Sequence, residues 1–469
     1  MVWWRALRIL GKRGALAALF FSLACVPPVA GHAASEVAPA APPSGFVLGQ
    51  TQLSDGLTLI ARSLTASPTA ALEIWIRCPA TGYGPSRPGI ARLAALALLE
   101  QKSGDATLRE QVRRAGAQIG VSVYHEGTEI AILSPSYLAP AMLDKLTAQI
   151  LHPKVDRNAY LAARQRLAAQ QVAAIEVPDQ LLRDALFERI FASGPLHEPT
   201  YGNTQTLAGL TLDDVNRFLA RAYVPRSEIV IAAGRVDGSD VSRRVAASAP
   251  PAAGNSEPIP DSVVAGSAGS APATLHSSPA GAAGVAIGWV GPPIADEQAA
   301  TAMDFLSDYL THPASGVVSQ AVDNLDASAK FNGQFITLRS PGVFFISVSG
   351  NALDPDAALG TIRDAVKKVL AGQLSKNDFE RALTAFRTHL LRDLQTPQEV
   401  ADNYGWYFTQ GATSYSPSAT DAQLAGDYFA QVQSLTPAYV FAVAKRYLST
   451  TPTVVLLPRG ALHTASDTK

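Results

Sequence analysis

The sequence predicts an α+β protein made of two homologous repeats, each a largely antiparallel sheet covered by helices, that together form a clamshell. Its length of 469 residues, with 47% apolar and 16% charged residues, suits a globular protein of two or three domains. The same order of strand and helix patterns occurs twice along the chain. A stretch rich in alanine, proline, glycine and serine, residues 245–274, separates the two copies and is typical of an extended linker.

Residues 1–33 have the pattern of a secretory signal peptide. A basic segment precedes an apolar run of 11 residues, 14–24, which is too short to span a bilayer comfortably, and small residues follow at Gly31 and Ala33. An uncleaved anchor and a lipid attached at Cys25 are the alternatives. We therefore expect export across the inner membrane to the periplasm.

Cleavage after Ala33 would leave Cys78 as the single cysteine, so the mature chain would have no internal disulfide. The removed segment holds four basic and no acidic residues, so the formal charge would change from −1 to −5. This mild acidity disfavours a nucleic-acid partner.

The first repeat is expected over residues 46–240 and the second over 275–460. Near the start of the first, "ALEIWIRCPA" alternates apolar Leu72, Ile74 and Ile76 with Glu73, Trp75 and Arg77, which predicts a strand with one buried face. The second repeat opens similarly with "GVAIGWVGPP", in which Trp289 corresponds to Trp75.

The remaining elements follow in the same order in both repeats. A helix comes first in both repeats, and in the first repeat it is "RPGIARLAALALLE" at 87–100. A helix followed by two strands comes next, at 108–137 in the first repeat and at 318–350 in the second. A long helix is expected at 157–175 and 376–394, and a closing helix and strand at 210–234 and 435–460. Thr211 and Thr436 are the predicted N-caps of the two closing helices.

In this order of pieces, the chain resembles the insulinase/pitrilysin (inverzincin) family of zinc peptidases, in its two-repeat, processing-peptidase-like form. The resemblance rests on "LSDGLTLIARSLTASPTAALEIWI" as an opening hairpin, on the Pro-Gly helix, on "LREQVRRAGAQIGVSVYHEGTEIAI" and on the closing segment from Tyr201. It covers nearly all of residues 46–458 and implies the family's fold.

The resemblance also implies where zinc would bind, because the family uses an H-x-x-E-H motif on the Pro-Gly helix. Those positions fall at Arg92, Ala95 and Leu96, and the third ligand, a glutamate in the family, falls at Gln170 or Gln171. Arginine has no lone pair for a metal, alanine cannot accept a proton, and leucine cannot ligate. We therefore expect no catalytic residue, no metal and no cofactor at these degenerate positions.

Active members of the family also use an arginine and a tyrosine from the second half, and the matching positions here are roughly Val322 and Ala329. The mature histidines are all more than five residues apart, so each is expected in a loop or on a solvated helix face. A metal site assembled from distant parts stays open as an alternative.

Two further features have competing interpretations. Arg92 is expected to reach solvent from the helix start, or to pair with an acid across the clamshell. The aromatic cluster "NYGWYF", residues 403–408, is expected to anchor a helix on the second sheet, with a recognition patch as the alternative.

The favoured function is a non-catalytic, peptidase-like subunit that binds extended peptides and pairs, as a heterodimer, with a catalytic zinc-peptidase sibling. The alternatives are a scaffold or binding protein unrelated to proteolysis, and a zinc metallopeptidase with a relocated site.

Overall fold

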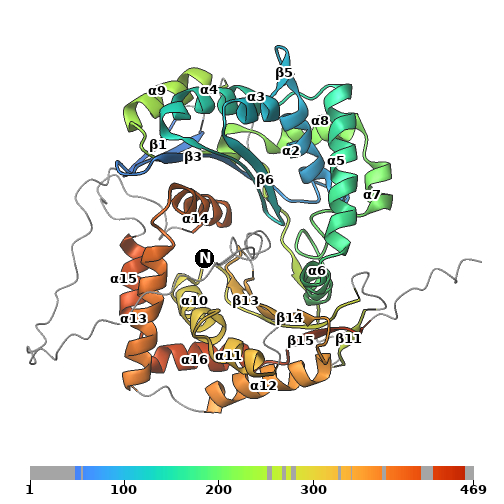
Figure 1. Cartoon of the computed structure of the whole chain (residues 1–469), viewed down its shortest axis with the longest axis vertical. Helices are drawn as coiled ribbons and strands as arrows, with labels where there is room; N and C mark the ends of the chain where they lie inside the picture. Colours follow the sequence, from blue (N-terminus) through green and yellow to red (C-terminus); the bar gives the residue numbers. More distant parts are fainter. Residues whose placement is uncertain are drawn as a thin grey trace, which may run out of the picture.

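The computed structural model describes residues 48–53, 56–250, 256–266, 271–275, 281–325, 329–339, 341–371, 376–412 and 426–459. The predicted signal peptide and Cys25 lie outside these residues. Two repeats face each other across the molecule, the first in blue and green and the second in yellow to red (Figure 1). In the part of the chain that the structure describes, no helix combines the length and the hydropathy that a membrane span requires.

The first repeat is built on a six-stranded sheet with the order β1-β2-β9-β3-β7-β6. All neighbours are antiparallel except β2 and β9. The strands are β1 (Leu48–Gln52), β2 (Thr58–Ser63), β3 (Thr69–Arg77), β6 (Gln118–Tyr124), β7 (Gly127–Pro135) and β9 (Glu228–Gly234). The helices on its outer face are α2 (Ile90–Glu100), α3 (Leu108–Arg114), α4 (Ala139–Ile150), α5 (Arg157–Ile175), α8 (Leu212–Ala222) and α9 (Gly238–Ser248).

The second repeat has a five-stranded sheet with the order β11-β15-β12-β14-β13, in which only β11 and β15 are parallel. The strands are β11 (Ala273–Thr274), β12 (Ala283–Val290), β13 (Lys330–Ile336), β14 (Val343–Gly350) and β15 (Thr453–Leu457). Its helices include α10 (Glu297–Thr311), α11 (Val317–Leu325), α12 (Pro355–Ala371), α13 (Lys376–Arg392), α15 (Gly426–Ser434) and α16 (Pro437–Leu448). By their order in the repeat, α10 and α13 correspond to α2 and α5. The predicted α+β class with two similar halves is confirmed.

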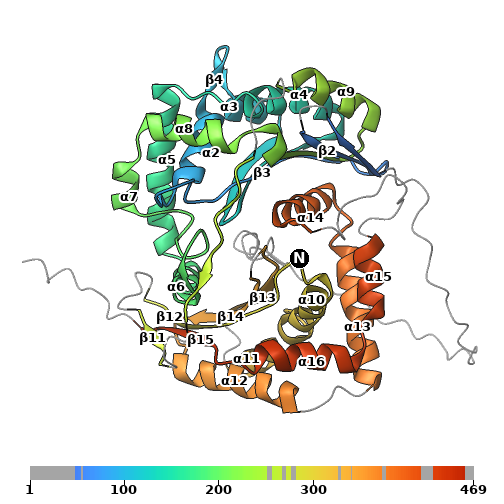
Figure 2. The same ribbon diagram turned by 180° about the vertical axis from the view of Figure 1, so that it is seen from behind.

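Each repeat sends one helix onto the inner face of the other repeat's sheet. Helix α6 (Pro178–Ile190) of the first repeat packs on β12, β14 and β15, and α14 (Pro397–Gln410) of the second packs on β3, β7 and β9 (Figures 1 and 2). This exchange explains why the expectation of one buried face for β3 was wrong. Leu72 faces the core under the outer helices, while Trp75 on the opposite face is covered by α14 and is 1% exposed.

Helix capping follows the sequence. The side chains of Thr211 and Thr436 accept hydrogen bonds from Asp214 N and Tyr439 N, so both predicted N-caps are confirmed. The predicted linker, in contrast, makes contacts that its composition did not indicate. Within it, β10 (Val263–Val264) pairs with β8 (Phe191–Ser193), β11 pairs with β15, and Glu257 forms an ion pair with Arg221. The backbone groups of a segment with few apolar side chains can still add to a sheet edge.

Candidate degenerate metal site

Helix α2 is buried along nearly its whole length, with ten of its 11 residues inside the protein. It begins after Gly89, which has φ of 90°. A Cβ on that glycine would lie 2.9 Å from the carbonyl oxygen of Tyr201, so a side chain there would meet both backbone strain and a close contact. The Pro-Gly pair therefore sets the start of the helix against the loop that carries Tyr201.

Arg92 lies inside the protein, where only 6% of it is exposed, so the expected route to solvent was wrong. The alternative, an acid partner across the clamshell, stays a prediction, and the acid whose charge acts on Arg92 is Asp184 of α6. The guanidinium carbon of Arg92 is 3.8 Å from the centre of the Tyr201 ring, and Nη2 donates to Val123 O at 3.5 Å. Burial lowers the pKa of Arg92, while Tyr201, Tyr124 and Asp184 raise it. The aromatic ring takes the place of a carboxylate as the main partner of this cation.

The other two motif positions are apolar and tightly packed. Ala95 is 0% exposed and Leu96 is 2% exposed, and both belong to the core of the first repeat. Neither side chain can hold a metal or accept a proton. The helix keeps its packing role at these positions.

The structure brings the position of the third ligand close to Arg92. Gln171 of α5 is buried and donates from Nε2 to the carbonyl oxygen of Tyr201 at 2.8 Å, while Gln170 lies beside it and is half-buried. Arg92 and Gln171 therefore meet around one residue, Tyr201. A guanidinium, a phenol ring and an amide occupy the space between α2 and α5, and this set offers donors and a fixed positive charge rather than metal ligands.

The two positions in the second repeat are also apolar. Val322 lies on α11 and is 1% exposed, within the core of the repeat, and Ala329 is half-buried just before β13. Neither can stabilise a developing negative charge by hydrogen bonding.

The aromatic cluster anchors a helix, as expected, but on the other sheet. Tyr404 and Gly405 of α14 lie against Trp75 of the first repeat, and the ring of Phe408 lies under the Arg77 guanidinium at 4.9 Å. The expectation that it packs on the second sheet was wrong for Tyr404 and Phe408, because α14 crosses between the repeats, while Tyr407 lies in the core of the second repeat.

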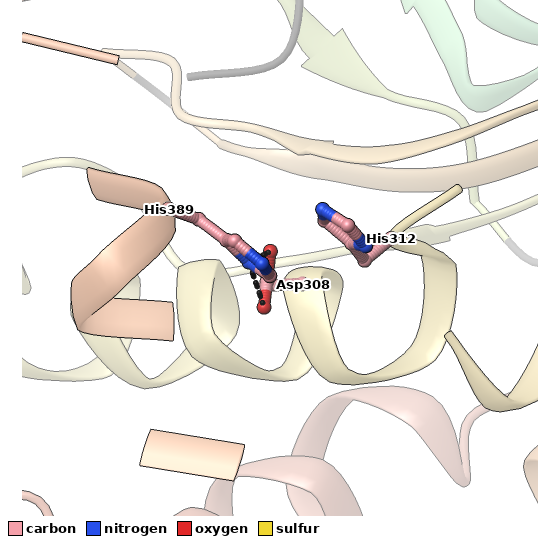
Figure 3. Close-up of side chains that lie close together, drawn as sticks. All are labelled: Asp308, His312 and His389. Carbon is pink, nitrogen blue, oxygen red and sulfur yellow. Dashed lines mark hydrogen bonds and ion pairs between the residues drawn. The ribbon is translucent and has the colours of Figure 1, made fainter. Parts of the chain in front are cut away.

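His152 and His197 lie in loops, as expected, but three other histidines are packed against rings or polar side chains. His125 is stacked on Phe187, with ring centres 5.1 Å apart, and burial lowers its pKa to about 3. His312 and His389 are stacked on each other beside Asp308 (Figure 3). They are far apart in the sequence, so only the i, i+4 spacing of Asp308 and His312 on one helix was a signal for this cluster.

Residues 209–386 match the family described as peptidase M16 inactive domain. An uncharacterized zinc protease of Streptomyces coelicolor is 23% identical over 208 residues, which cover 42% of this chain and 44% of that protein. The chain thus spans less than half the length of that curated relative.

Solved structures share the fold over most of the chain. A protease from Helicobacter pylori superposes with a TM-score of 0.77 at 18% identity, over 88% of this chain and 99% of that one. A chain of complex III2 from Candida albicans gives a TM-score of 0.73 at 15% identity, over 87% of this chain and 95% of that one.

Proposed function

We propose that this chain, a two-repeat member of the insulinase/pitrilysin (M16) peptidase family, is a non-catalytic subunit that binds extended peptides beside a catalytic sibling. The observation that carries the proposal is the state of helix α2. The helix keeps its buried place in the fold, while Arg92, Ala95 and Leu96 stand where the family has its two histidines and its glutamate. We propose accordingly that no zinc is held between α2 and α5.

An edge strand next to this helix supports the peptide-binding part. Strand β6 pairs with β7 on one side, and no other strand among the described residues pairs with its second edge. Tyr124 and Gly127 flank a two-residue turn and form a hydrogen-bonded pair, so the next residue along β6, Val123, turns its backbone groups to the second edge, where its carbonyl oxygen accepts from Arg92. An extended peptide can add to such an edge through main-chain hydrogen bonds.

The partner proposal follows from the missing residues. A subunit without the family's metal ligands on α2 and α5 contributes to hydrolysis only beside one that has them, so the partner is a sibling with an intact H-x-x-E-H motif in a heterodimer. The signal-peptide pattern of residues 1–33 supports export and a periplasmic location for the pair.

Peptide binding is tested with the substitution Val121→Pro. Val121 lies two residues before Val123 and presents its N–H to the same free edge. Removing that donor is expected to weaken binding of a fluorescent, unstructured peptide about tenfold, the effect of one lost hydrogen bond. Fluorescence anisotropy measures the affinity.

Val121→Thr is the matched control, because it keeps the N–H and a β-branched side chain and should bind as the unchanged chain does. Equal affinities for the proline and threonine variants, both folded by circular dichroism, would rule out peptide addition at β6.

A scaffold role is the second candidate, favoured by the likeness to a chain of complex III2. A scaffold would bind no free extended peptide, and it would be recovered from the native host with a stable assembly that contains no H-x-x-E-H subunit.

A further inference from the structure

We propose that Asp308, His312 and His389 form a binding site for one first-row divalent metal ion, with Zn²⁺ as the favoured ion, that joins α10 to α13. The site lies in the second repeat, away from the degenerate positions on α2, and the proposal does not depend on peptide binding or on a sibling subunit.

Two helices bring the three side chains together (Figure 3). Asp308 and His312 are one turn apart at the end of α10, so they share a face of that helix. His389 reaches them from α13, and its Nδ1 lies 2.9 and 3.1 Å from the two carboxylate oxygens of Asp308. The two imidazole rings are nearly parallel, with centres 3.9 Å apart.

The donor set suits a transition metal. One atom from each residue, an imidazole nitrogen or a carboxylate oxygen, lies within 4.8 Å of the others. Zinc binds such atoms at about 2.0–2.2 Å in a tetrahedron, which places neighbouring ligand atoms roughly 3.3 Å apart. Metal binding therefore requires the imidazoles to rotate about their side-chain bonds, which unstacks the rings and brings the three atoms to that separation.

The exposure of the cluster allows an ion to enter. The side chains of His389 and Asp308 are 18% and 13% exposed, so they are partly shielded but reachable from solvent. With three protein ligands, the fourth position of a tetrahedral site is left to water. The single carboxylate offsets part of the charge of a divalent ion, and two neutral imidazoles favour zinc, copper or nickel over magnesium or calcium.

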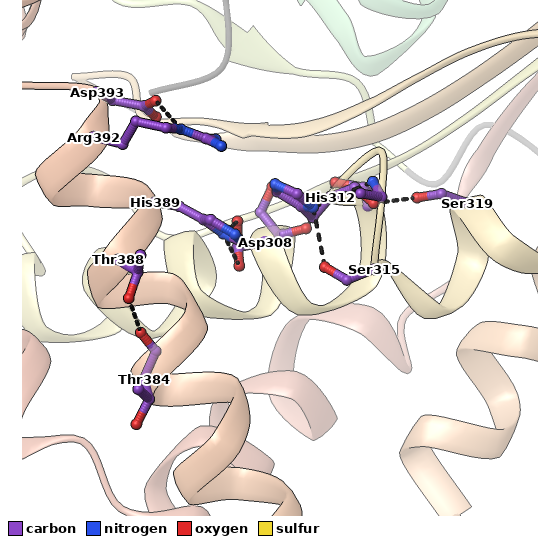
Figure 4. Close-up of polar contacts among 12 residues, drawn as sticks. Asp308, His312, Ser315, Ser319, Thr384, Thr388, His389, Arg392 and Asp393 are labelled. Carbon is purple, nitrogen blue, oxygen red and sulfur yellow. Dashed lines mark hydrogen bonds and ion pairs between the residues drawn. The ribbon is translucent and has the colours of Figure 1, made fainter. Parts of the chain in front are cut away.

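Neighbouring groups hold the cluster in place (Figure 4). The Ser315 hydroxyl lies 3.0 Å from His312 Nδ1, and the backbone N–H of Ala314 donates to the same nitrogen at 3.3 Å. A metal-bound histidine donates its second ring N–H to a neighbouring acceptor, so zinc at His312 Nε2 requires Nδ1–H to donate to the Ser315 hydroxyl oxygen and the Ala314 N–H to turn away.

The test uses the full mature chain, dialysed first against a chelator and then against buffer. Titration calorimetry with ZnCl₂ is expected to show one bound ion per chain, and the melting temperature is expected to rise by several degrees with zinc in excess. His389→Gln and Asp308→Asn should each lower the zinc affinity at least about 100-fold and remove the zinc-dependent rise in melting temperature.

His152→Gln is the matched control, because His152 lies in the first repeat and bonds only to the carbonyl oxygen of Ser248 among the contacts described. It should bind zinc as the unchanged chain does. Asp308→Asn is nearly isosteric, so its zinc affinity tests the proposal even if His389→Gln does not fold. Unchanged zinc affinity in Asp308→Asn, or no zinc binding by the unchanged chain, would overturn the proposal.

Discussion

Replacing Gly405 with alanine is expected to lower the free energy of unfolding by about 3 kcal/mol, at the upper end of the usual cost of overpacking a core. A Cβ at this position would overlap the indole nitrogen of Trp75. That indole cannot move easily, because Nε1 donates to Glu73 Oε2 at 2.7 Å and the ring is stacked on Tyr124. Helix α14 would have to move away from β3, which would disturb the contact between the repeats.

Gly360→Ala is the matched control for this prediction. Gly360 also lies inside a helix, α12, but it is exposed and a Cβ there would meet no atom within 4 Å. The change should stabilise the chain by roughly 0.5–1 kcal/mol through helix propensity. Urea unfolding of both variants gives the comparison, and a Gly405→Ala variant as stable as the unchanged chain would show that α14 does not lie this close to β3.

Raising the pH from 5 to 8 is expected to destabilise the contact between the repeats through two buried carboxyl groups, those of Glu73 and Glu129. Glu73, Glu129 and Asp402 each offer an oxygen within 4.8 Å of the others, where α14 covers β3 and β7. Burial, followed by the nearby charge of Glu129, raises the pKa of Glu73 well above its usual range. Burial raises the pKa of Glu129 to about 7.

The direction of the effect follows from proton binding. Glu129 keeps its proton in the folded chain up to about pH 7, whereas in the unfolded chain it ionises near its usual pKa of 4.5. The folded state therefore binds more protons between these values, and its stability falls as the pH rises through that window. Glu129→Gln removes this titration, so the variant should be more stable than the unchanged chain at pH 8, by on the order of 2 kcal/mol, and similar at pH 5.

Other groups also titrate in this range. Burial raises the pKa of Asp304 to about 6 and lowers that of His125 to about 3, so only the difference between variant and unchanged chain is diagnostic. Urea unfolding at pH 5, 6, 7 and 8 measures that difference. The exposed Glu176→Gln serves as control and should show none. A Glu129→Gln variant whose stability parallels that of the unchanged chain at every pH would mean that this carboxyl group ionises normally in the folded protein.

The order of elements could be predicted because it depends on local patterns. Alternation along β3 and the caps at Thr211 and Thr436 are set by neighbouring residues, and the repetition of the pattern confirmed the grouping into two halves. The polar face of β3 was misjudged because Glu73 and Trp75 have the composition of a solvated face. The helix that covers them comes from the other repeat, so no local pattern indicates it.

At the degenerate metal site, too, local sequence patterns predicted some features and missed others. The residues that replace the metal ligands could be read from the sequence, since the motif has fixed spacing on one helix. The burial of Arg92 could not, because it depends on Tyr201, a residue of a distant loop that lies against Gly89. The cluster of His312 and His389 likewise depends on how α13 crosses α10.

Peptide turnover by the isolated, zinc-loaded mature chain tests most directly whether this protein is a non-catalytic subunit. With an unstructured fluorogenic peptide, we expect the chain alone to show no chelator-sensitive hydrolysis. The Asp308→Asn variant should give the same result. Addition of a sibling subunit with an intact H-x-x-E-H motif should produce chelator-sensitive hydrolysis faster than the sibling gives alone. Chelator-sensitive turnover by the isolated chain, lost in Asp308→Asn, would contradict the proposed role and identify a zinc peptidase with a relocated site.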